Sequence, residues 1–110
     1  MRVISKRTLT EFWESDLKHA VARPSLEAWY AEAKIAEWRS PADIKAKYKN
    51  ASILKNGRVV FNIKGNDYRL IVHIHYESQI IYICWIGTHR DYDDEDAETV
   101  HAPKANQVRK

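Results

Sequence analysis

Arg69 is the first residue whose surroundings suggest chemistry, because it places a permanent positive charge inside an apolar stretch, Tyr68–Tyr76. An arginine is costly to bury unless an anion or strong hydrogen-bond acceptors accompany it. One interpretation is phosphate binding, since the planar guanidinium matches two phosphate oxygens at once. The other is an ion pair with Asp67 or with an acid of residues 91–98. The sequence alone leaves both interpretations open.

A second group of reactive side chains lies in Gly87-Thr88-His89-Arg90-Asp91-Tyr92, directly after an expected strand. Loops that follow strands commonly carry functional groups, and histidine is the side chain best suited to moving protons near neutral pH. Tyr92 follows three residues after His89, close enough to hydrogen-bond the same substrate. The spacing by itself is weak evidence, because a lone surface histidine most often has no chemical function.

His73 and His75 form a third group, because side chains two residues apart on a strand point to the same face and can share a metal ion. Cys84 is expected on that face as well, which makes a zinc site conceivable although a fourth ligand is not evident. The plainer interpretation of Cys84 is a small buried apolar residue rather than a nucleophile.

Three strands must position these groups, and period-two patterns predict them at Arg58–Ile63, Tyr68–Tyr76 and Gln79–Gly87. Lys64-Gly65-Asn66-Asp67 forms the first turn and Glu77-Ser78 the second. If the second turn is a two-residue loop, Tyr76 pairs with Gln79 and fixes the register. One face of the sheet then carries only apolar residues: Leu70, Val72, Ile74, Trp85, Ile83 and Ile81, together with Val59, Phe61 and Ile63.

The opposite face is half polar, and it presents Arg69, Asn62 and His73. On this mixed face we expect the following neighbours: Arg58, Val60, Ile71 and His75, beside Ile86, Cys84, Tyr82 and Ile80. The sheet therefore has one side for helices and one side for a ligand.

Helices are predicted in the first half of the chain, after a short strand at Arg2-Val3-Ile4. Ser5 or Thr8 caps the first helix, a second runs from Ser25 to about Glu37, and a short third begins at Ser40-Pro41-Ala42-Asp43. Their inward faces are expected to carry these residues: Leu9, Phe12 and Trp13; Leu26, Trp29, Tyr30 and Ala33; Ile44 and Tyr48. We expect the tryptophans to belong to the core.

The chain of 110 residues is predicted to be a single domain over residues 1–100, followed by a disordered tail, residues 101–110. A single cysteine excludes an internal disulfide framework, and no apolar run approaches the roughly 20 residues that cross a bilayer. The composition and the absence of a signal-like N-terminus predict a cytoplasmic protein without a membrane partner.

Charge is unevenly distributed along the chain. Six acids and no Lys or Arg fall in residues 91–100, so the other hundred residues carry all 18 cations against nine acids, a net +9. A basic body favours a polyanionic partner, although solvated helix faces explain the cations equally well. The acidic segment could begin a helix at Asp93-Asp94-Glu95, fold back on the basic face, or remain a solvated end.

Several pieces of the sequence match a known family in order over roughly residues 1–100. They are Met1-Arg2-Val3-Ile4-Ser5-Lys6, Glu11-Phe12-Trp13-Glu14, Ala28-Trp29-Tyr30, Val59-Val60-Phe61-Asn62-Ile63, Asn66-Asp67-Tyr68-Arg69-Leu70-Ile71-Val72, Ile86-Gly87-Thr88-His89, Tyr92-Asp93 and Asp96-Ala97-Glu98-Thr99. With these pieces the chain resembles the HigB family of toxins from type II toxin–antitoxin systems, within the RelE-like group. The Tyr68–Ile71 and Gly87–His89 pieces are the most specific.

The resemblance implies a small RelE-like α+β fold, with a short N-terminal strand and two to three helices packed on one face of a mainly antiparallel sheet. It implies a metal-independent endoribonuclease (an mRNA interferase) without a cofactor, which cuts mRNA on the ribosome and inhibits translation. The implied partner besides mRNA is a HigA-like helix-turn-helix antitoxin. Two alternatives from other classes are a non-catalytic RNA- or partner-binding module and a zinc-binding structural domain.

The implied reaction is attack of an RNA 2′-hydroxyl on the adjacent phosphate, which gives a 2′,3′-cyclic phosphate and a 5′-hydroxyl. Carried over by motif, Arg69 holds the phosphate, His89 transfers a proton, and Tyr92 orients the nucleotide or shares the proton transfer. The residues expected to bind RNA around them are Asn62, Lys64, His73 and Arg90.

Overall fold

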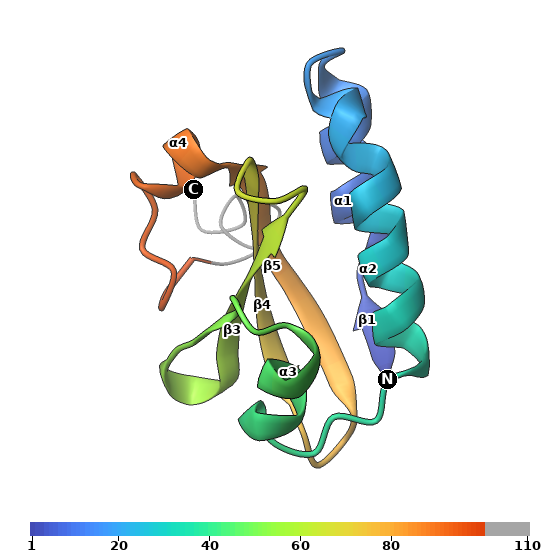
Figure 1. Cartoon of the computed structure of the whole chain (residues 1–110), viewed down its shortest axis with the longest axis vertical. Coiled ribbons are helices and arrows are strands. Elements are labelled where there is room, and N and C mark those ends of the chain that lie inside the picture. Colours follow the sequence, from blue (N-terminus) through green and yellow to red (C-terminus); the bar gives the residue numbers. More distant parts are fainter. Residues whose placement is uncertain (101–110) are drawn as a thin grey trace, which may run out of the picture.

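The computed structural model describes residues 1–100, in which helices cover one face of a five-stranded sheet (Figure 1). The elements follow in the order β1 (Arg2–Ile4), α1 (Lys6–Ser15), the 3₁₀ turn η1 (His19–Ala22), α2 (Arg23–Ile35), α3 (Pro41–Lys47), β2 (Ser52–Ile53), the 3₁₀ turn η2 (Lys55–Gly57), β3 (Arg58–Ile63), β4 (Tyr68–His75), β5 (Ile80–Thr88) and α4 (His89–Tyr92). The predicted α+β class is confirmed. The predicted tail, residues 101–110, lies outside the described residues.

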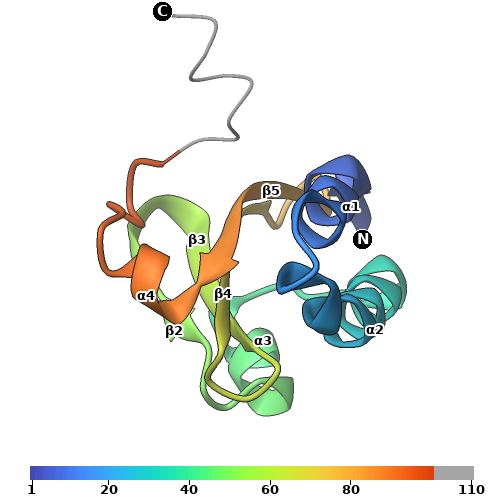
Figure 2. The ribbon, with the colours of Figure 1, turned by 90° about the horizontal axis from the view of Figure 1, so that it is seen from above.

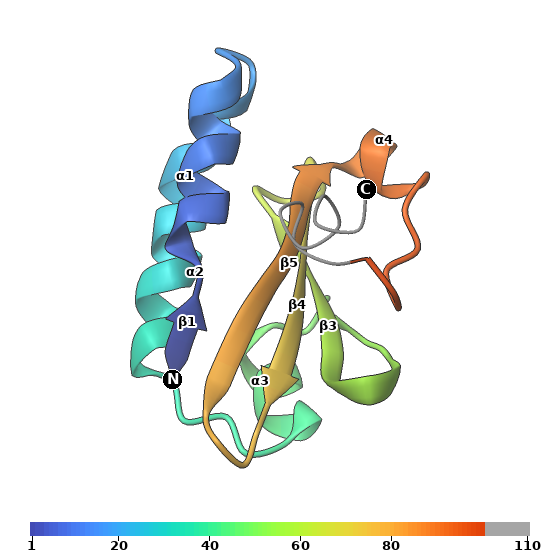
Figure 3. The ribbon, with the colours of Figure 1, turned by 180° about the vertical axis from the view of Figure 1, so that it is seen from behind.

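The sheet has the strand order β1-β5-β4-β3-β2, and only the β1–β5 pair is parallel (Figure 3). The three central strands lie within a residue of their predicted bounds, because their β-branched alternation is strong. The edge strand β2 was not predicted, since Ser52–Ile53 is too short to show any period. No helix among residues 1–100 has the length and apolar character that a membrane span requires.

Local capping explains where the helices begin. Ser5 precedes α1, and its hydroxyl accepts a hydrogen bond from the backbone N–H of Arg7 at 3.2 Å, as predicted. α2 starts at Arg23, two residues before the predicted Ser25, with proline in its first turn. α3 begins at the predicted Pro41, but the capping bond comes from Asp43, whose carboxylate accepts from the backbone N–H of Arg39 at 2.9 Å.

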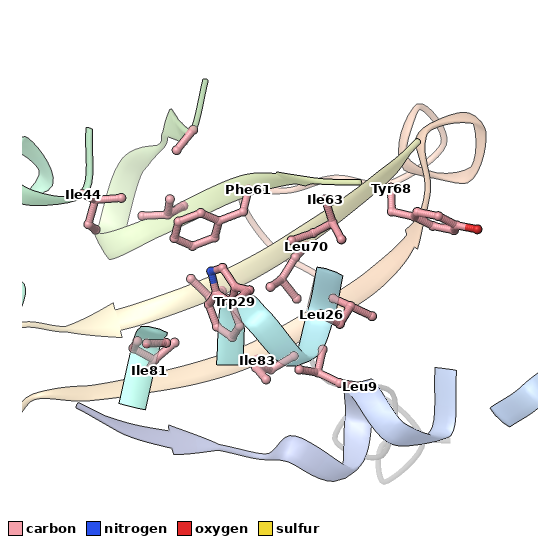
Figure 4. Close-up of a cluster of buried hydrophobic side chains, with 14 of the residues drawn as sticks. Leu9, Leu26, Trp29, Ile44, Phe61, Ile63, Tyr68, Leu70, Ile81 and Ile83 are labelled. Carbon is pink, nitrogen blue, oxygen red and sulfur yellow. The ribbon is translucent and has the colours of Figure 1, made fainter. Parts of the chain in front are cut away.

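The main core lies between the helices and the sheet (Figure 4). Phe61 of β3 is its centre: this ring is fully buried and lies 5.0 Å from Tyr48, 5.4 Å from Trp29 and 6.0 Å from Trp38, measured between centroids. Three of the four tryptophans are buried in this core, as predicted: Trp13, Trp29 and Trp38. Figure 2 shows α1 and α2 on one side of the sheet and α4 on the other, so this core leaves the second side for a different role.

The predicted pairing of β4 with β5 is correct in one half and wrong in the other. Val72 pairs with Ile83 and Ile74 with Ile81, as expected. Beyond them a β-bulge leaves Cys84 unpaired, so Trp85 lies opposite Ile71 rather than on the helix face. One extra residue reverses the facing of every following side chain. The run from Ile80 to Ile86 is apolar at nearly every position, so no alternation in the sequence reveals this change of phase.

The hairpin turn between β4 and β5 is also longer than the predicted Glu77-Ser78 pair. The strands end at His75 and Ile80, which pair with each other. Gln79 in the turn has a φ of 58°, and its side-chain amide donates 2.8 Å hydrogen bonds to the carbonyls of Trp38 and Tyr76. A pairing of Tyr76 with Gln79 also places His75 opposite Ile80. The register is therefore as predicted although the turn is longer, and the pairing of Ile74 with Ile81 is correct.

Candidate active site

The second face of the sheet carries a small apolar cluster of its own. Val60, Ile71 and Cys84 are buried there, and the partly buried residues packed against them are Leu54, Trp85, Tyr92, Ala97 and Val100. The last three of these residues follow β5, so the chain folds back over this face. The segment thus folds back on this face, one of the three alternatives for it, while its carboxylates stay exposed. The alternative of a helix that begins at Asp93 is wrong: α4 ends at Tyr92, and residues 93–100 contain no helix.

Arg69 is nearly buried on this face, with 9% of its surface exposed. Its Nη1 donates to the carbonyl oxygens of Asn66 (3.1 Å) and Tyr68 (3.2 Å), and its Nη2 donates to the side-chain oxygen of Asn66 (2.7 Å). No carboxylate among residues 1–100 forms an ion pair with it, and Asp67 instead pairs with Lys64 at 3.3 Å. The expected ion pair with Asp67 or an acid of residues 91–98 is therefore not formed within the described chain.

The hydrogen bonds of Arg69 leave part of its guanidinium free. A guanidinium has five N–H donors, and three of them make the bonds above. Within residues 1–100 the Nε–H and one N–H of Nη2 donate to no protein group. These two adjacent nitrogens form the fork that matches two oxygens of a phosphate. Arg69 thus offers a buried positive charge, held by neutral oxygens, with a bidentate donor pair left over.

α4 brings Tyr92 to Arg69. The Thr88 hydroxyl caps this short helix by accepting from the backbone N–H of Asp91 at 3.0 Å. The Arg69 guanidinium carbon lies 5.9 Å from the centre of the Tyr92 ring, whose centroid is 6.3 Å from that of Trp85. A guanidinium at this distance from an aromatic ring is attracted to it. Tyr92 of α4 therefore lies next to Arg69, and Trp85 of β5 lies next to Tyr92.

His89 lies at the same end of the sheet. Its backbone N–H donates to the carbonyl oxygen of Asp67 at 2.9 Å, which ties the start of α4 to the turn between β3 and β4. That turn also supplies Asn66 to Arg69. The structure thus gathers the three residues that the sequence proposed for catalysis around one end of β4 and β5.

Asn62 and Gly87 flank Arg69 in one row across the sheet, because both pair with it in the strand register. The Asn62 side chain therefore lies next to Arg69 on the same face. Gly87 is required by the Trp85 indole: a Cβ atom at Gly87 would meet two ring carbons at 2.4 and 2.5 Å. The glycine lets this ring lie across the end of the strand, beside the row.

The other residues predicted to bind RNA are Lys64, Arg90 and His73, and they do not all lie near this row. Lys64 lies in the adjoining turn and Arg90 is exposed on α4. His73 lies elsewhere, paired with Arg58 and Tyr82 four positions along β4 from Arg69, a separation of about 13 Å at 3.3 Å per residue. The structure brings Lys64 and Arg90 to the site and leaves His73 apart from it.

The histidines of β4 are not part of a metal cluster. Their ring centroids are 4.7 Å apart, but within residues 1–100 no three His, Cys, Asp or Glu side chains gather in a way that could hold a metal ion. Cys84 lies in the bulge, where burial raises the pKa of its thiol while the charge of Arg58 opposes that rise. Both observations favour the interpretation of Cys84 as a buried apolar residue.

The sequence comparison identifies the family of this chain. The family model of the HigB toxin, described as the RelE-like toxic component of a toxin–antitoxin system, matches residues 22–95. This chain belongs to the HigB toxin family. The matched range includes Arg69, His89 and Tyr92, and membership confirms the resemblance seen in the sequence.

Curated members of the HigB family show the same relationship. The chain is 27% identical over 95 residues to the mRNA interferase toxin HigB of Escherichia coli (strain K12), a match that covers 84% of this chain and 88% of the relative. The mRNA interferases HigB of Escherichia coli O157:H7 and Shigella flexneri match with the same identity and coverage. The chain therefore spans most of the length of each of these HigB proteins.

Sequence reasoning missed the roles of Asn66, Trp85 and Arg58. Asn66 holds Arg69 through both its carbonyl and its side chain, although the sequence showed it only in a turn and in a matched family piece, without a role. Trp85 was assigned to the wrong face because of the bulge. Arg58 was placed on the correct face without a role, and its partners are more than 35 residues away along the chain, a separation of 39 for Ala97 and 42 for Val100. No local pattern could have revealed such a contact.

Proposed function

We propose that this HigB-family toxin is an endoribonuclease that cuts mRNA on the ribosome and so inhibits translation. The proposal combines the family membership with one observation: Arg69 is a buried cation without a carboxylate partner in the described chain, and its Nε and Nη2 form a free donor pair. A phosphodiester supplies the missing negative charge in the geometry that this pair accepts.

The reaction requires few groups. The 2′-hydroxyl oxygen attacks the adjacent phosphorus and loses its proton to a base, and the bond from phosphorus to the 5′-oxygen breaks as that oxygen receives a proton from an acid. The products are a 2′,3′-cyclic phosphate and a 5′-hydroxyl. Arg69 stabilises the additional negative charge on the phosphate oxygens in the transition state, where a fixed cation is most effective.

Proton transfer is assigned to His89, with Tyr92 as the second group. His89 stands at the start of α4, which the Asp67 carbonyl and the Thr88 cap hold in place. Tyr92 packs against Arg69, so it can orient the nucleotide or share the proton transfer. The chemistry uses no metal ion in this scheme.

RNA binding around the phosphate is assigned to the polar residues of the same face. Asn62 lies beside Arg69, and Lys64 in the turn between β3 and β4 and Arg90 on α4 add positive charge at the same end of the sheet. His73, further along β4, would contact a more distant nucleotide of the same strand. A HigA-like antitoxin with a helix-turn-helix domain is the proposed protein partner.

Growth arrest and mRNA cleavage test this proposal. Induction of the wild-type chain in a bacterial host should stop growth and yield mRNA fragments with 5′-hydroxyl ends, and purified protein should cut mRNA on ribosomes. Arg69→Ala and His89→Gln should each lower the cleavage rate by about 10²–10³-fold and relieve the arrest.

The matched controls are Arg39→Met and His75→Gln, which alter exposed residues away from the row and should leave cleavage unchanged. Continued arrest and cleavage in both the Arg69 and His89 variants would contradict the assigned chemistry. If the wild-type protein binds RNA and leaves it intact even on translating ribosomes, the protein is a binding module rather than a nuclease.

A further inference from the structure

The segment that follows Tyr92, residues 93–100, is here called the C-terminal strap, and Arg58 fastens it to the sheet. Arg58 is the first residue of β3 and has only 6% of its surface exposed. Its Nη1 donates to the carbonyl oxygen of Ala97 at 3.3 Å and to that of Val100. A bond from a charged donor is worth more than a neutral one, so this pair of contacts anchors the end of the strap.

Within residues 1–100, the C-terminal strap also contacts the second face through two apolar side chains. Ala97 and Val100 pack against the buried cluster of Val60, Ile71 and Cys84. The carboxylates of the strap are exposed, and none of them forms an ion pair with Arg58: Asp93, Asp94, Glu95, Asp96 and Glu98. Two small apolar contacts alone bury little surface. Arg58 therefore carries much of the attachment.

Tyr92 depends on this attachment. It immediately precedes the strap and belongs to α4, a helix of four residues, and so short a helix is not stable by itself in water. The Thr88 cap holds the start of α4, and its end is joined to the strap, whose first backbone N–H groups donate to carbonyls of α4. A loosened strap would release the Tyr92 ring from its place near Arg69 and Trp85.

We propose that Arg58 is a positioning residue for the proposed RNA cleavage: by fastening the C-terminal strap, it holds Tyr92 over Arg69. The inference rests on the proposed function for its consequence and on the described contacts for its mechanism. Arg58 does not contact the reacting phosphate in this scheme, since it pairs with His73, four positions from Arg69 along β4. Its Nη1 is bound to the carbonyls of the strap.

The attachment can be measured without any activity, because Cys84 is the single cysteine of the chain and lies under the strap. A soluble aromatic disulfide should react slowly with the wild-type thiol. Arg58→Met should increase the reaction rate by about tenfold, and Arg58→Lys, which keeps a cationic donor, should increase it less. Arg39→Met removes an exposed arginine elsewhere and should react like the wild type.

The sign of this change is diagnostic. The charge of Arg58 lowers the pKa of the Cys84 thiol, so its removal by itself would reduce the thiolate fraction and slow the reaction. In a variant whose thermal midpoint shows that the chain is still folded, faster labelling then reports opening of the structure over Cys84. An unchanged or slower rate in Arg58→Met overturns the proposal, whether or not the protein cuts RNA.

A double-mutant cycle tests the consequence for catalysis. Arg58→Met should lower kcat about tenfold with little change in KM, and it should have no further effect in a Tyr92→Ala background. Two results would mean that Arg58 acts on RNA directly and would overturn the positioning role. One is that the kcat losses of the two single variants multiply in the double variant; the other is that Arg58→Met raises KM and leaves kcat unchanged. Partial recovery in Arg58→Lys supports it.

The two proposals fail in different ways. If labelling accelerates as expected and the wild-type protein cuts no RNA, the nuclease proposal fails and the strap attachment stands. If Arg58→Met lowers the thermal midpoint so far that the whole chain opens, Val100→Ser is the second variant: it weakens the apolar packing of the strap on the buried cluster and leaves β3 and the carbonyl that Arg58 binds unchanged. Val100→Ser should then accelerate labelling and lower kcat, and a wild-type result in both measurements overturns the inference.

Discussion

The two faces of the sheet differ in what they bury: apolar side chains on one face, and two arginines with a small apolar cluster on the other. On the helix face every buried residue is hydrophobic, and α1, α2 and α3 all contribute side chains to the core that contains Phe61. On the second face only Val60, Ile71 and Cys84 form a buried apolar cluster, and both buried charged residues of the described chain, Arg58 and Arg69, lie there. Burial of apolar side chains on the first face stabilises the fold. On the second face, taking the two arginine charges out of water costs free energy.

The two arginines of the second face also differ from each other. Arg58 donates to carbonyls far away in the sequence, so it joins the strap to β3. Arg69 donates to oxygens of the adjoining turn and keeps two donors free of protein partners in residues 1–100. A buried guanidinium solvated by neutral oxygens retains its full charge. One arginine thus joins two distant segments of the chain, and the other is proposed to bind a phosphate.

The largest expected effect concerns stability on the helix face. Phe61→Ala removes a fully buried ring that contacts three aromatic residues, and it should cost about 3–5 kcal/mol of the free energy of unfolding. Val100→Ala, which trims the partly buried strap on the second face, should cost less than about 1 kcal/mol. Urea denaturation measures both values. Equal losses would show that the second face is as important to stability as the first.

The next effect tests the bulge that separates the two faces along β5. Deletion of Cys84 removes the unpaired residue, so Ile83 still faces Val72 and Trp85 still faces Ile71. It should cost about 1–3 kcal/mol of the free energy of unfolding. Deletion of Tyr82 instead carries the fully buried Ile81 onto the second face and should cost more. If the two deletions are equally damaging, the bulge does not set the facing of β5.

A smaller effect is expected for Asn62→Asp, which should weaken RNA binding without changing stability. Asn62→Asp places a carboxylate beside Arg69 in the strand register, where the new ion pair would neutralise the free donors. We expect RNA affinity to fall about tenfold, or about 1.4 kcal/mol, with no loss of thermal stability. Asn50→Asp adds the same charge at an exposed position after α3 and should have little effect. Loss of stability without loss of RNA affinity would place Asn62 with the structural residues.

The smallest effect is the pH dependence of the helix face. Burial, then the hydrogen bond that the Tyr48 hydroxyl donates to Glu32, and then the charge of that carboxylate raise the pKa of the Tyr48 phenol. In the unfolded chain this phenol ionises near pH 10, whereas in the folded chain it ionises only at higher pH. The stabilisation is therefore complete below about pH 10 and is lost as pH rises further.

Tyr48→Phe should flatten this alkaline loss, as measured by denaturation at several pH values. Tyr76 contributes in the same direction, because burial and then the charge of Asp43 raise its pKa. Tyr76→Phe is therefore the second variant to compare. An alkaline slope that is identical in all three proteins would assign the loss to other groups.

Much of the fold could be read from the sequence because its signals are local. The alternation in β3 and β4, the helical spacing of Leu26, Trp29 and Ala33, and the proline at the start of α3 each reflect neighbouring residues. The site was identified in the same way, since Arg69 stands out against an apolar strand and His89 follows a strand end. Its residue roles came from the family resemblance and remain predictions.

The sequence by itself determined the first strand, the three N-terminal helices and the three central strands, most residues of the main core, and that one face of the sheet carries charge. Only the tertiary structure decided that Cys84 forms a bulge, that Trp85 turns to the second face, and that Arg58 binds the strap. The reason is that backbone preferences and side-chain periodicity are local properties. Contacts across 39 or 42 residues exist only after the strands have paired and the chain has folded back.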